Sequence, residues 1–277
     1  MTNSKELFRD LVAKVILPES RDEIEAIIYM LMEIRLGVDR QAILNEKKIK
    51  AIPVELDPFI DRINQQEPIQ YILGKAVFFG RTFNVKPSVL IPRPETELLI
   101  SEIKGLNSNT PSIMDVGTGC GCIAITLALE INGSKVIAID ISEAALTVAK
   151  ENALKYNASI NFQLMDILSQ NLKIRELDIL VSNPPYVTES EKALMSKNVL
   201  EYEPSIALFV SDSDPLQFYR AIAQQGLTVL KEGGLLITEL NEKFGRETAS
   251  LFSQLGYRTI GILKDLDGKD RVIAATR

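Results

Sequence analysis

The segment 112–129 constrains the fold of this chain more than any other part of it. Ser112–Val116 is typical of a buried strand, a glycine-rich loop follows directly, and the apolar run 122–129 then has the character of a helix. Glycines in a strand-to-helix loop permit a tight turn and let a ligand approach the backbone, where the helix N-terminus offers free N–H groups. This order predicts a unit of an α/β sheet with a ligand site at the carboxyl end of its strand.

The spacing of the glycines limits the classes of ligand that the loop can bind. The loop reads Gly117-Thr118-Gly119-Cys120-Gly121, which is G-x-G-x-G. A dinucleotide fingerprint is G-x-G-x-x-G, and Cys122 stands where its third glycine would be, which counts against NAD and FAD. A P-loop is excluded because the Lys-Ser or Lys-Thr pair is missing.

Two acids end the next two predicted strands. Asp140 follows the apolar run 136–139, and Asp166 follows the run 160–165. A carboxylate at the tip of the second strand can accept both ribose hydroxyls of a nucleoside, and the next one can accept a hydrogen bond from an adenine amino group. Each acid is also a common cap or turn residue. S-adenosylmethionine fits an acidic site because it has a ribose and an adenine but no phosphate.

The tetrapeptide Asn183-Pro184-Pro185-Tyr186 follows the apolar run Leu177–Ser182, where a buried strand should meet solvent. Two prolines contribute no N–H and hold φ near about −65°, so carbonyl oxygens point outward. Asn183 adds a side-chain oxygen and Tyr186 adds a flat ring. Such paired acceptors suit a planar NH2 and favour the pyramidal nitrogen that can attack a methyl donor. The corner predicts nitrogen alkylation, although alone it is as readily a plain loop.

Helices and strands alternate in the remainder of the chain. We expect a long irregular, substrate-facing loop over 188–210. The elements expected after it are a helix over 216–231, a strand over 235–240, a helix over 244–255 and a last hairpin of strands near 257–263 and 271–276. The pattern predicts an α/β fold with a mostly parallel sheet whose last strand is antiparallel.

The first 69 residues have the periodicity of helices. Apolar residues recur at helical spacing from Leu7 to Val15. Ser20 with Glu23 forms a capping-box pattern before a second helix, which should end at Gly37. Shorter helical pieces are expected over 40–45 and 54–65, with Pro68 closing the set. These stripes most simply form the core of a small bundle, whose outer faces are free to bind a protein.

A linker with a β-hairpin is expected over 70–92, where strands 77–79 and 82–85 flank Gly80-Arg81. The larger domain then covers 93–277. Its first residues, 93–97, either start a helix, with Pro94 in the first turn, or take a direct part in the site.

Composition argues against several classes of function. The 277 residues carry 31 Lys+Arg against 37 Asp+Glu, a net charge of −6, whereas nucleic-acid binding draws most of its affinity from Lys and Arg. Because the sequence has only two cysteines and no histidine, we expect no metal centre. No segment reaches the roughly 20 apolar residues of a membrane span and no signal peptide is evident, so we expect a cytoplasmic protein without membrane contact.

The combination of motifs resembles the HemK/PrmC family, the glutamine N5-methyltransferases of peptide chain release factors. The residues that carry the resemblance are the loop 117–121, Asp140, the corner 183–186, the stretch 91–97 (Ile-Pro-Arg-Pro-Glu-Thr-Glu), and Glu203-Pro204 with Ala207-Leu208. The resemblance spans nearly the whole chain. It implies a Rossmann-like class I methyltransferase domain with a seven-stranded sheet, behind a helical N-terminal domain that contacts the release factor.

The resemblance also implies roles for individual residues. Asn183 and the Pro184 carbonyl would hold the substrate glutamine amide, Tyr186 would pack on it, and Pro185 would shape the corner. The residues implied for S-adenosylmethionine binding are Gly117, Thr118, Gly119, Cys120, Gly121, Asp140, Asp166 and Asn183. A monomer is expected. Two other functions stay open: a nucleic-acid methyltransferase acting on adenine N6 or guanine N2, because the corner can hold the amine of a flipped base, and a cofactor-binding scaffold without catalysis.

Overall fold

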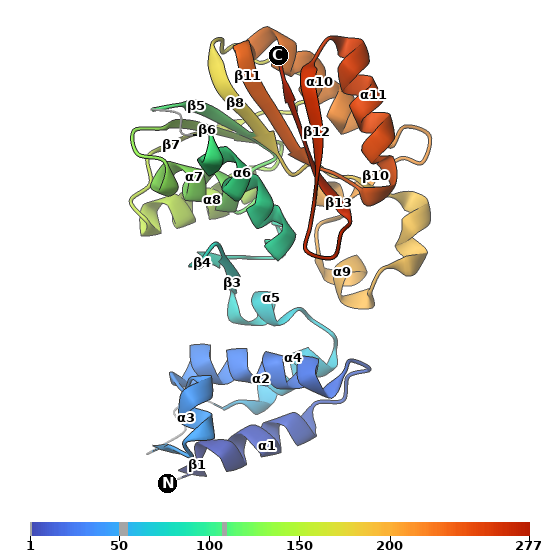
Figure 1. Cartoon of the computed structure of the whole chain (residues 1–277). Helices are drawn as coiled ribbons and strands as arrows, with labels where there is room; N and C mark the ends of the chain where they lie inside the picture. Colours follow the sequence, from blue (N-terminus) through green and yellow to red (C-terminus); the bar gives the residue numbers. More distant parts are fainter. Residues whose placement is uncertain (1, 50–54, 107–109) are drawn as a thin grey trace. The chain divides into compact units, whose positions relative to one another are not determined.

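The structure is a computed structural model that describes residues 2–49, 55–106 and 110–277 (Figure 1). The chain divides into two compact units. One comprises Met1–Lys75 with Ser196–Tyr202, and the other comprises Ala76–Met195 with Glu203–Arg277. The first unit thus extends beyond residue 69 and includes a short segment from the second half of the chain.

The first unit is built from helices around one apolar core. Its elements are β1 (Thr2–Asn3), α1 (Ser4–Lys14), α2 (Arg21–Leu36), α3 (Arg40–Leu44), β2 (Lys48–Ile49), α4 (Asp57–Asn64), α5 (Ile69–Leu73) and α9 (Lys197–Tyr202). Ser20 and Glu23 form the predicted capping box at the start of α2, and Gly37 ends this helix in the left-handed conformation, as predicted. The core includes Ile28, Leu31 and Met32 of α2, all fully buried.

Two sequence expectations for this unit differ from the structure. Pro68 does not end the helices, because it stands at the N-cap of α5, where a missing N–H costs nothing. The helix expected over 54–65 is observed as Asp57–Asn64, with a proline in its first turn. Residue 54, at the predicted start, lies outside the described residues.

The second unit begins with the predicted β-hairpin, formed by β3 (Lys75–Phe78) and β4 (Arg81–Asn84). The turn residues are Phe79 and Gly80, one position earlier than expected, with φ of 49° and 69°. Positive φ at both positions matches the right-handed twist of the two strands. Phe78 and Phe83 are fully buried and anchor the hairpin to its unit.

A seven-stranded sheet forms the centre of the second unit, in the order β12-β13-β11-β8-β5-β6-β7. Its strands are β5 (Ser112–Val116), β6 (Lys135–Asp140), β7 (Ile160–Leu164), β8 (Leu177–Ser182), β11 (Leu230–Glu239), β12 (Arg258–Lys264) and β13 (Asp270–Thr276). β13 runs antiparallel to both of its neighbours, and the other pairings are parallel. The predicted mostly parallel sheet with an antiparallel last strand is therefore confirmed. One strand differs from the prediction, because β11 begins five residues earlier than expected, with a bulge between Leu230 and Leu235.

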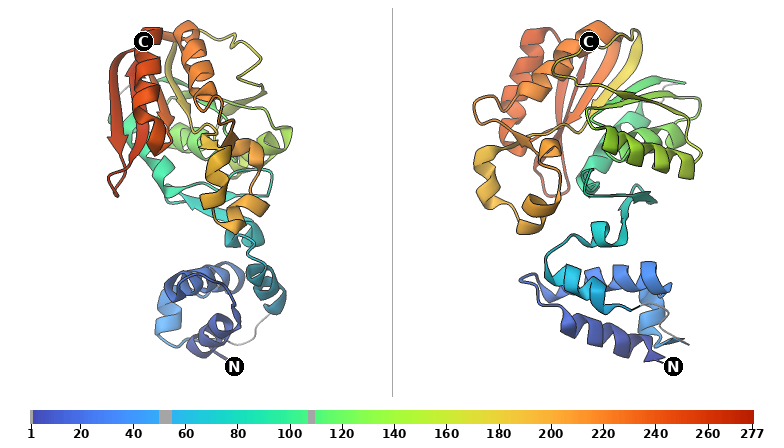
Figure 2. Two further views of the ribbon diagram at one scale, coloured as in Figure 1. Left: turned by 90° about the vertical axis from the view of Figure 1, so that its right-hand side faces the viewer. Right: turned by 180° about the vertical axis from the view of Figure 1, so that it is seen from behind.

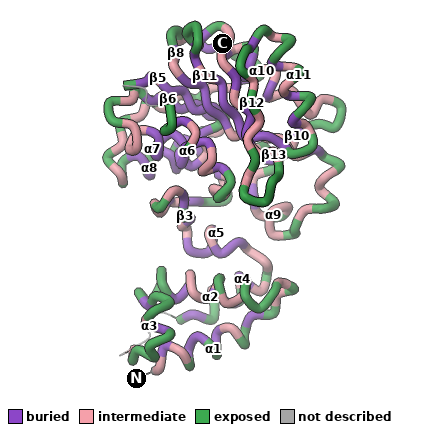
Figure 3. Tube along the Cα trace, in the orientation of Figure 1, coloured by how far each residue is buried: buried purple, intermediate pink, exposed green. Residues whose placement is uncertain are grey.

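Helices cover both faces of this sheet (Figures 1 and 2). They are α6 (Glu97–Gly105), α7 (Cys122–Glu130), α8 (Glu143–Lys155), α10 (Gln217–Val229) and α11 (Gly245–Leu255). Met114 and Leu180 pack in one cluster with Ile222 of α10 and Phe252 of α11. Because side chains alternate along a strand, Ile113 and its equivalents face the opposite helix layer. The inner strands β5, β8 and β11 are accordingly buried along much of their length (Figure 3), whereas the edge strands β7 and β12 contain no buried residue.

The segment 188–210 is more ordered than the sequence suggests. It contains η2 (Glu189–Leu194), α9 and η3 (Ser205–Ala207), and its ends are joined by parallel pairing of β9 (Val187–Thr188) with β10 (Phe209–Val210). A capping box at Thr188 and Glu191 starts η2. Further 3-10 turns lie at η1 (Pro94–Thr96) and η4 (Glu242–Phe244). Across residues 2–49, 55–106 and 110–277, we find no helix with the length and hydropathy that a membrane crossing requires.

Candidate active site

The sheet topology brings the predicted site residues to one edge. Val116 of β5 pairs with Ile139 of β6 and with Ser182 of β8, so the three strands end at the same level. From β5 the chain continues through α7 to β6 on one side, whereas β8 lies on the other side of β5. The strand order therefore reverses at β5, and α/β proteins bind ligands at the carboxyl ends of the strands at such a switch point.

A cavity lies at this edge, within the second unit. The predicted residues that line it are Gly117, Gly119, Asp140, Asp166, Asn183, Pro184 and Pro185. Apolar side chains complete much of the wall, among them Ile141, Met165, Ile167 and Leu168. Of the other predicted residues, Thr118, Cys120, Gly121 and Tyr186 do not line the cavity in the described structure. The roles of all of these residues remain predictions.

The glycine loop is held by backbone hydrogen bonds from the neighbouring strand. The Gly117 and Thr118 N–H groups both donate to the Ile139 carbonyl, at 2.9 and 3.0 Å. Gly119 has a φ of 56°, and a Cβ at this position would face open space, so a ligand can approach the backbone there. A Cβ on Gly121 would instead come within 3.1 Å of the Ala149 Cβ, so this glycine allows α7 and α8 to pack closely.

Asp140 connects the loop to the start of α8. Its Oδ2 accepts from the Gly119 N–H and its Oδ1 from the Ser142 N–H, both at 2.9 Å. Burial raises the pKa of Asp140, and these N–H donors partly offset the increase. The hydrogen bonds to the Asp166 carboxylate come from residues close to it in the sequence. Its oxygens accept from the Leu168 N–H (2.9 Å) and the Ser169 hydroxyl (2.7 Å). Each carboxylate oxygen retains a lone pair for a ligand.

The corner after β8 is supported by Thr96, which belongs to the predicted stretch 93–97, and by Glu239, which was not predicted from the sequence. Tyr186 donates its hydroxyl to Oε1 of Glu239 at 2.9 Å, and Thr96 donates to Oε2 of the same carboxylate at 2.6 Å. Burial raises the pKa of Glu239, and the hydrogen bonds from the two hydroxyls offset only part of this increase. Burial and the Glu239 carboxylate also raise the pKa of the Tyr186 phenol, which therefore stays protonated and donates. Glu239 ends β11 as Asp140 ends β6, but the strand predicted from the sequence extends to residue 240, so Glu239 was not identified as a strand-end acid.

The stretch 93–97 both starts a helical turn and contributes to the site. Pro94 lies in the first turn of η1, as expected, and α6 follows directly. Arg93 forms an ion pair with the buried Glu203, whose Oε2 also accepts from the Ile91 N–H at 3.1 Å. Since Leu90 and Pro204 both line the cavity, this pair ties two of its walls together.

Asp115 lies beneath the glycine loop and is fully buried. Its Oδ2 accepts from the Thr118 hydroxyl at 2.7 Å, and its Oδ1 has no partner among the described residues. Burial, with a smaller contribution from the Asp140 charge, raises the pKa of Asp115 to about 7. The folded protein thus binds this proton more tightly than the unfolded chain, whose carboxyl has an ordinary pKa.

We therefore expect Asp115→Asn to stabilise the protein at high pH. The stability that Asp115 contributes is complete below about pH 4 and is lost as the pH rises to about 7, a change of about 4 kcal/mol. Relative to the parent, the variant should show a free energy of unfolding larger by about 4 kcal/mol at pH 8 and similar near pH 4. Urea unfolding at both pH values tests this, with Asp267→Asn, at an exposed position, as the control. An equal difference at both pH values would contradict it.

The cavity fits S-adenosylmethionine. Two carboxylates, of Asp140 and Asp166, line the cavity together with apolar side chains that suit an adenine ring, and the loop leaves space next to the Gly119 backbone. In the described part of the chain, no Lys or Arg lines the cavity, so it lacks the cations that a phosphate-bearing nucleotide requires.

Fold and cavity together define an S-adenosylmethionine-dependent methyltransferase. Residues 94–202 match the family described as methyltransferase small domain. A methyltransferase structure from Pyrococcus furiosus shares the fold, with a TM-score of 0.54 and 17% identity over 80% of this chain and 98% of that one. The release factor glutamine methyltransferase of Bacteroides thetaiotaomicron is 44% identical over 92% of this chain and 94% of its own length. That of Flavobacterium psychrophilum is 40% identical over 91% of each. The chain belongs to the family of release factor glutamine methyltransferases.

Proposed function

We propose that this protein transfers a methyl group from S-adenosylmethionine to the side-chain amide nitrogen, N5, of the glutamine in the Gly-Gly-Gln motif of class 1 release factors. The main observation that supports this proposal is that Asn183 lines the same cavity as Gly119 and Asp140. When bound, the cofactor supplies an electrophilic methyl group on a sulfonium sulfur.

In this proposal the chain acts by positioning and by electrostatics. The Asn183 Oδ1 and the Pro184 carbonyl accept the two amide hydrogens of the substrate and hold its nitrogen toward the donor. The sequence has no histidine to act as a base. None is needed, because a methylated amide that still carries its extra proton is strongly acidic and releases it to water.

Incubation with labelled S-adenosylmethionine and either a release factor or nucleic acid tests the proposal. Label on the Gly-Gly-Gln glutamine is the expected result. Label on adenine or guanine would instead select the nucleic-acid alternative, and cofactor binding without transfer would select the scaffold. We extend the proposal to a monomer that acts in the cytoplasm.

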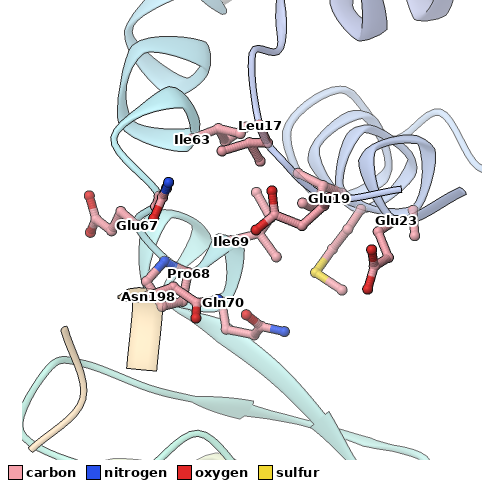
Figure 4. A pocket seen from close by; sticks show the side chains of 13 residues that line it. Leu17, Glu19, Glu23, Ile63, Glu67, Pro68, Ile69, Gln70 and Asn198 are labelled. Carbon is pink, nitrogen blue, oxygen red and sulfur yellow. The ribbon is translucent and has the colours of Figure 1, made fainter. Parts of the chain in front are cut away.

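The helical unit supplies, in this proposal, a second contact with the release factor. It contains a hollow with an apolar floor that includes Leu17, Ile63 and Ile69 (Figure 4). Three glutamates lie on its wall. Glu23 is already bound in the capping box with Ser20, whereas Oε2 of Glu19 is buried and has no partner among the described residues.

The shape and charge of this hollow suit a lysine or arginine side chain. Figure 4 shows the Glu19 carboxylate turned toward Ile69. The apolar stem of a long cationic side chain can cover the floor while its head binds the free carboxylate oxygen. A basic side chain on the surface of the protein substrate is thus the occupant that we propose.

Replacing Glu19 by glutamine should therefore weaken binding of the whole substrate without affecting the chemistry. We expect the KM for the full-length release factor to rise about 3- to 10-fold, with kcat and the KM for a short Gly-Gly-Gln peptide unchanged. Steady-state kinetics with both substrates measures this. Glu33→Gln, at an exposed position of α2, is the matched control. An unchanged KM for the full-length substrate would refute this role of the hollow.

A further inference from the structure

Three polar side chains from distant parts of the sequence form one chain of hydrogen bonds behind the corner. Asn183 Nδ2 donates to the Thr96 Oγ1 at 3.2 Å, and the Thr96 hydroxyl donates to Glu239. Thr96 and Glu239 are only 2% and 1% exposed, so water does not compete for these bonds. The chain starts at a buried carboxylate and ends at the cavity wall, where Asn183 lies.

The chemistry of each group determines the direction of the chain. A carboxylate accepts hydrogen bonds and does not donate them, so the single hydroxyl hydrogen of Thr96 points to Glu239. The Thr96 oxygen then offers only lone pairs to Asn183, and the amide atom that faces it must be the nitrogen. Since the two ends of an amide point in different directions, Oδ1 of Asn183 is left free to accept from a ligand.

The same carboxylate also holds the other end of the corner. Its Oε1 accepts from Tyr186, which lies three residues after Asn183. Loss of the Glu239 carboxylate would therefore release both residues together. A flipped Asn183 amide would direct an NH2 group at the substrate NH2, which places two donors against each other and removes an acceptor.

We propose that Thr96 and Glu239 are positioning residues that hold the Asn183 amide with its oxygen toward the substrate nitrogen. This inference rests on the proposed function, because it concerns how the same corner binds the substrate amide. Neither residue touches the substrate. Their effect is on the fraction of enzyme molecules in which the acceptor faces the correct way.

Thr96→Val tests this, because valine keeps the shape of threonine but lacks the hydroxyl. We expect kcat for the release factor to fall about 10-fold, with the dissociation constant of S-adenosylmethionine unchanged within about 2-fold. Thr96→Ser restores the hydroxyl and should restore kcat to within about 2-fold of the parent. Thr147→Val, at an exposed position of α8, is the matched control.

A double-mutant cycle separates this role from general damage to the fold. In an Asn183→Ala background, Thr96→Val should cause no further loss of kcat, because its effect passes through Asn183. A further 10-fold loss there, or parental kcat in Thr96→Val alone, would overturn the inference. If Thr96→Val does not fold, Glu239→Gln serves in the same cycle, since a glutamine cannot accept from both hydroxyls. Parental activity of Asn183→Ala itself would instead remove Asn183, and with it this inference, from the reaction, whereas absence of label on the release factor glutamine would refute the proposed function.

Discussion

Replacing Asn183 by alanine is expected to reduce methyl-transfer turnover by about 100- to 1,000-fold, the usual cost of removing one preorganised hydrogen-bonding group from a reacting centre. The amide nitrogen becomes more positive as it forms the new bond, so the Asn183 Oδ1 stabilises the transition state more than the bound substrate. The loss should therefore appear in kcat as well as in kcat/KM. Single-turnover transfer of labelled methyl to a release factor measures it.

Cofactor binding provides the internal control for this variant. The dissociation constant of S-adenosylmethionine should change by only about 3-fold, because the residues predicted to bind the ribose and adenine, Asp140 and Asp166, lie at or just after the ends of other strands. Asn161→Ala, which removes an exposed asparagine from β7, is the matched substitution and should retain parental turnover. Turnover in Asn183→Ala equal to that of the parent would remove Asn183 from the proposed reaction.

The parts of the fold that the sequence predicted correctly depend on local signals. Ser112–Val116, between a proline and a glycine, and Leu177–Ser182, which precedes Asn183-Pro184, are short and mostly apolar runs, and both are strands with the predicted bounds. Ser20 with Glu23 is a capping box because the two side chains satisfy N–H groups within one helical turn. Such signals need no knowledge of the rest of the chain.

The support of the candidate site could not be predicted in the same way. Thr96 and Glu239 are 143 positions apart in the sequence, and they meet because α6, which follows Thr96 directly, packs beside β11. The register of β11 against β8, with Thr238 opposite Ser182, places Glu239 next to the corner. The short helix α9 was missed for a related reason, because it belongs to the helical unit, whose other residues come much earlier in the sequence.

Loss of the Asp140 carboxylate should have its main effect on the cofactor. This carboxylate lines the cavity, and it also holds Gly119 and Ser142 through their N–H groups. If Asp140 holds the ribose as predicted, Asp140→Ala removes two charge-assisted hydrogen bonds to its hydroxyls, and it also removes the acceptor of the Gly119 and Ser142 N–H groups. We expect the dissociation constant of S-adenosylmethionine to rise about 100-fold or more.

Calorimetric titration with S-adenosylmethionine tests this prediction, and Asp267→Ala, in an exposed turn, is the matched control. Because the Asn183 corner is left intact, turnover at saturating cofactor should fall by less than the affinity does, about 10-fold at most. The two variants thus have opposite signatures: Asp140→Ala acts on cofactor affinity and Asn183→Ala on turnover. If Asp140→Ala bound the cofactor as tightly as the parent, the second strand end would have no part in nucleoside recognition, and the cavity would require another occupant.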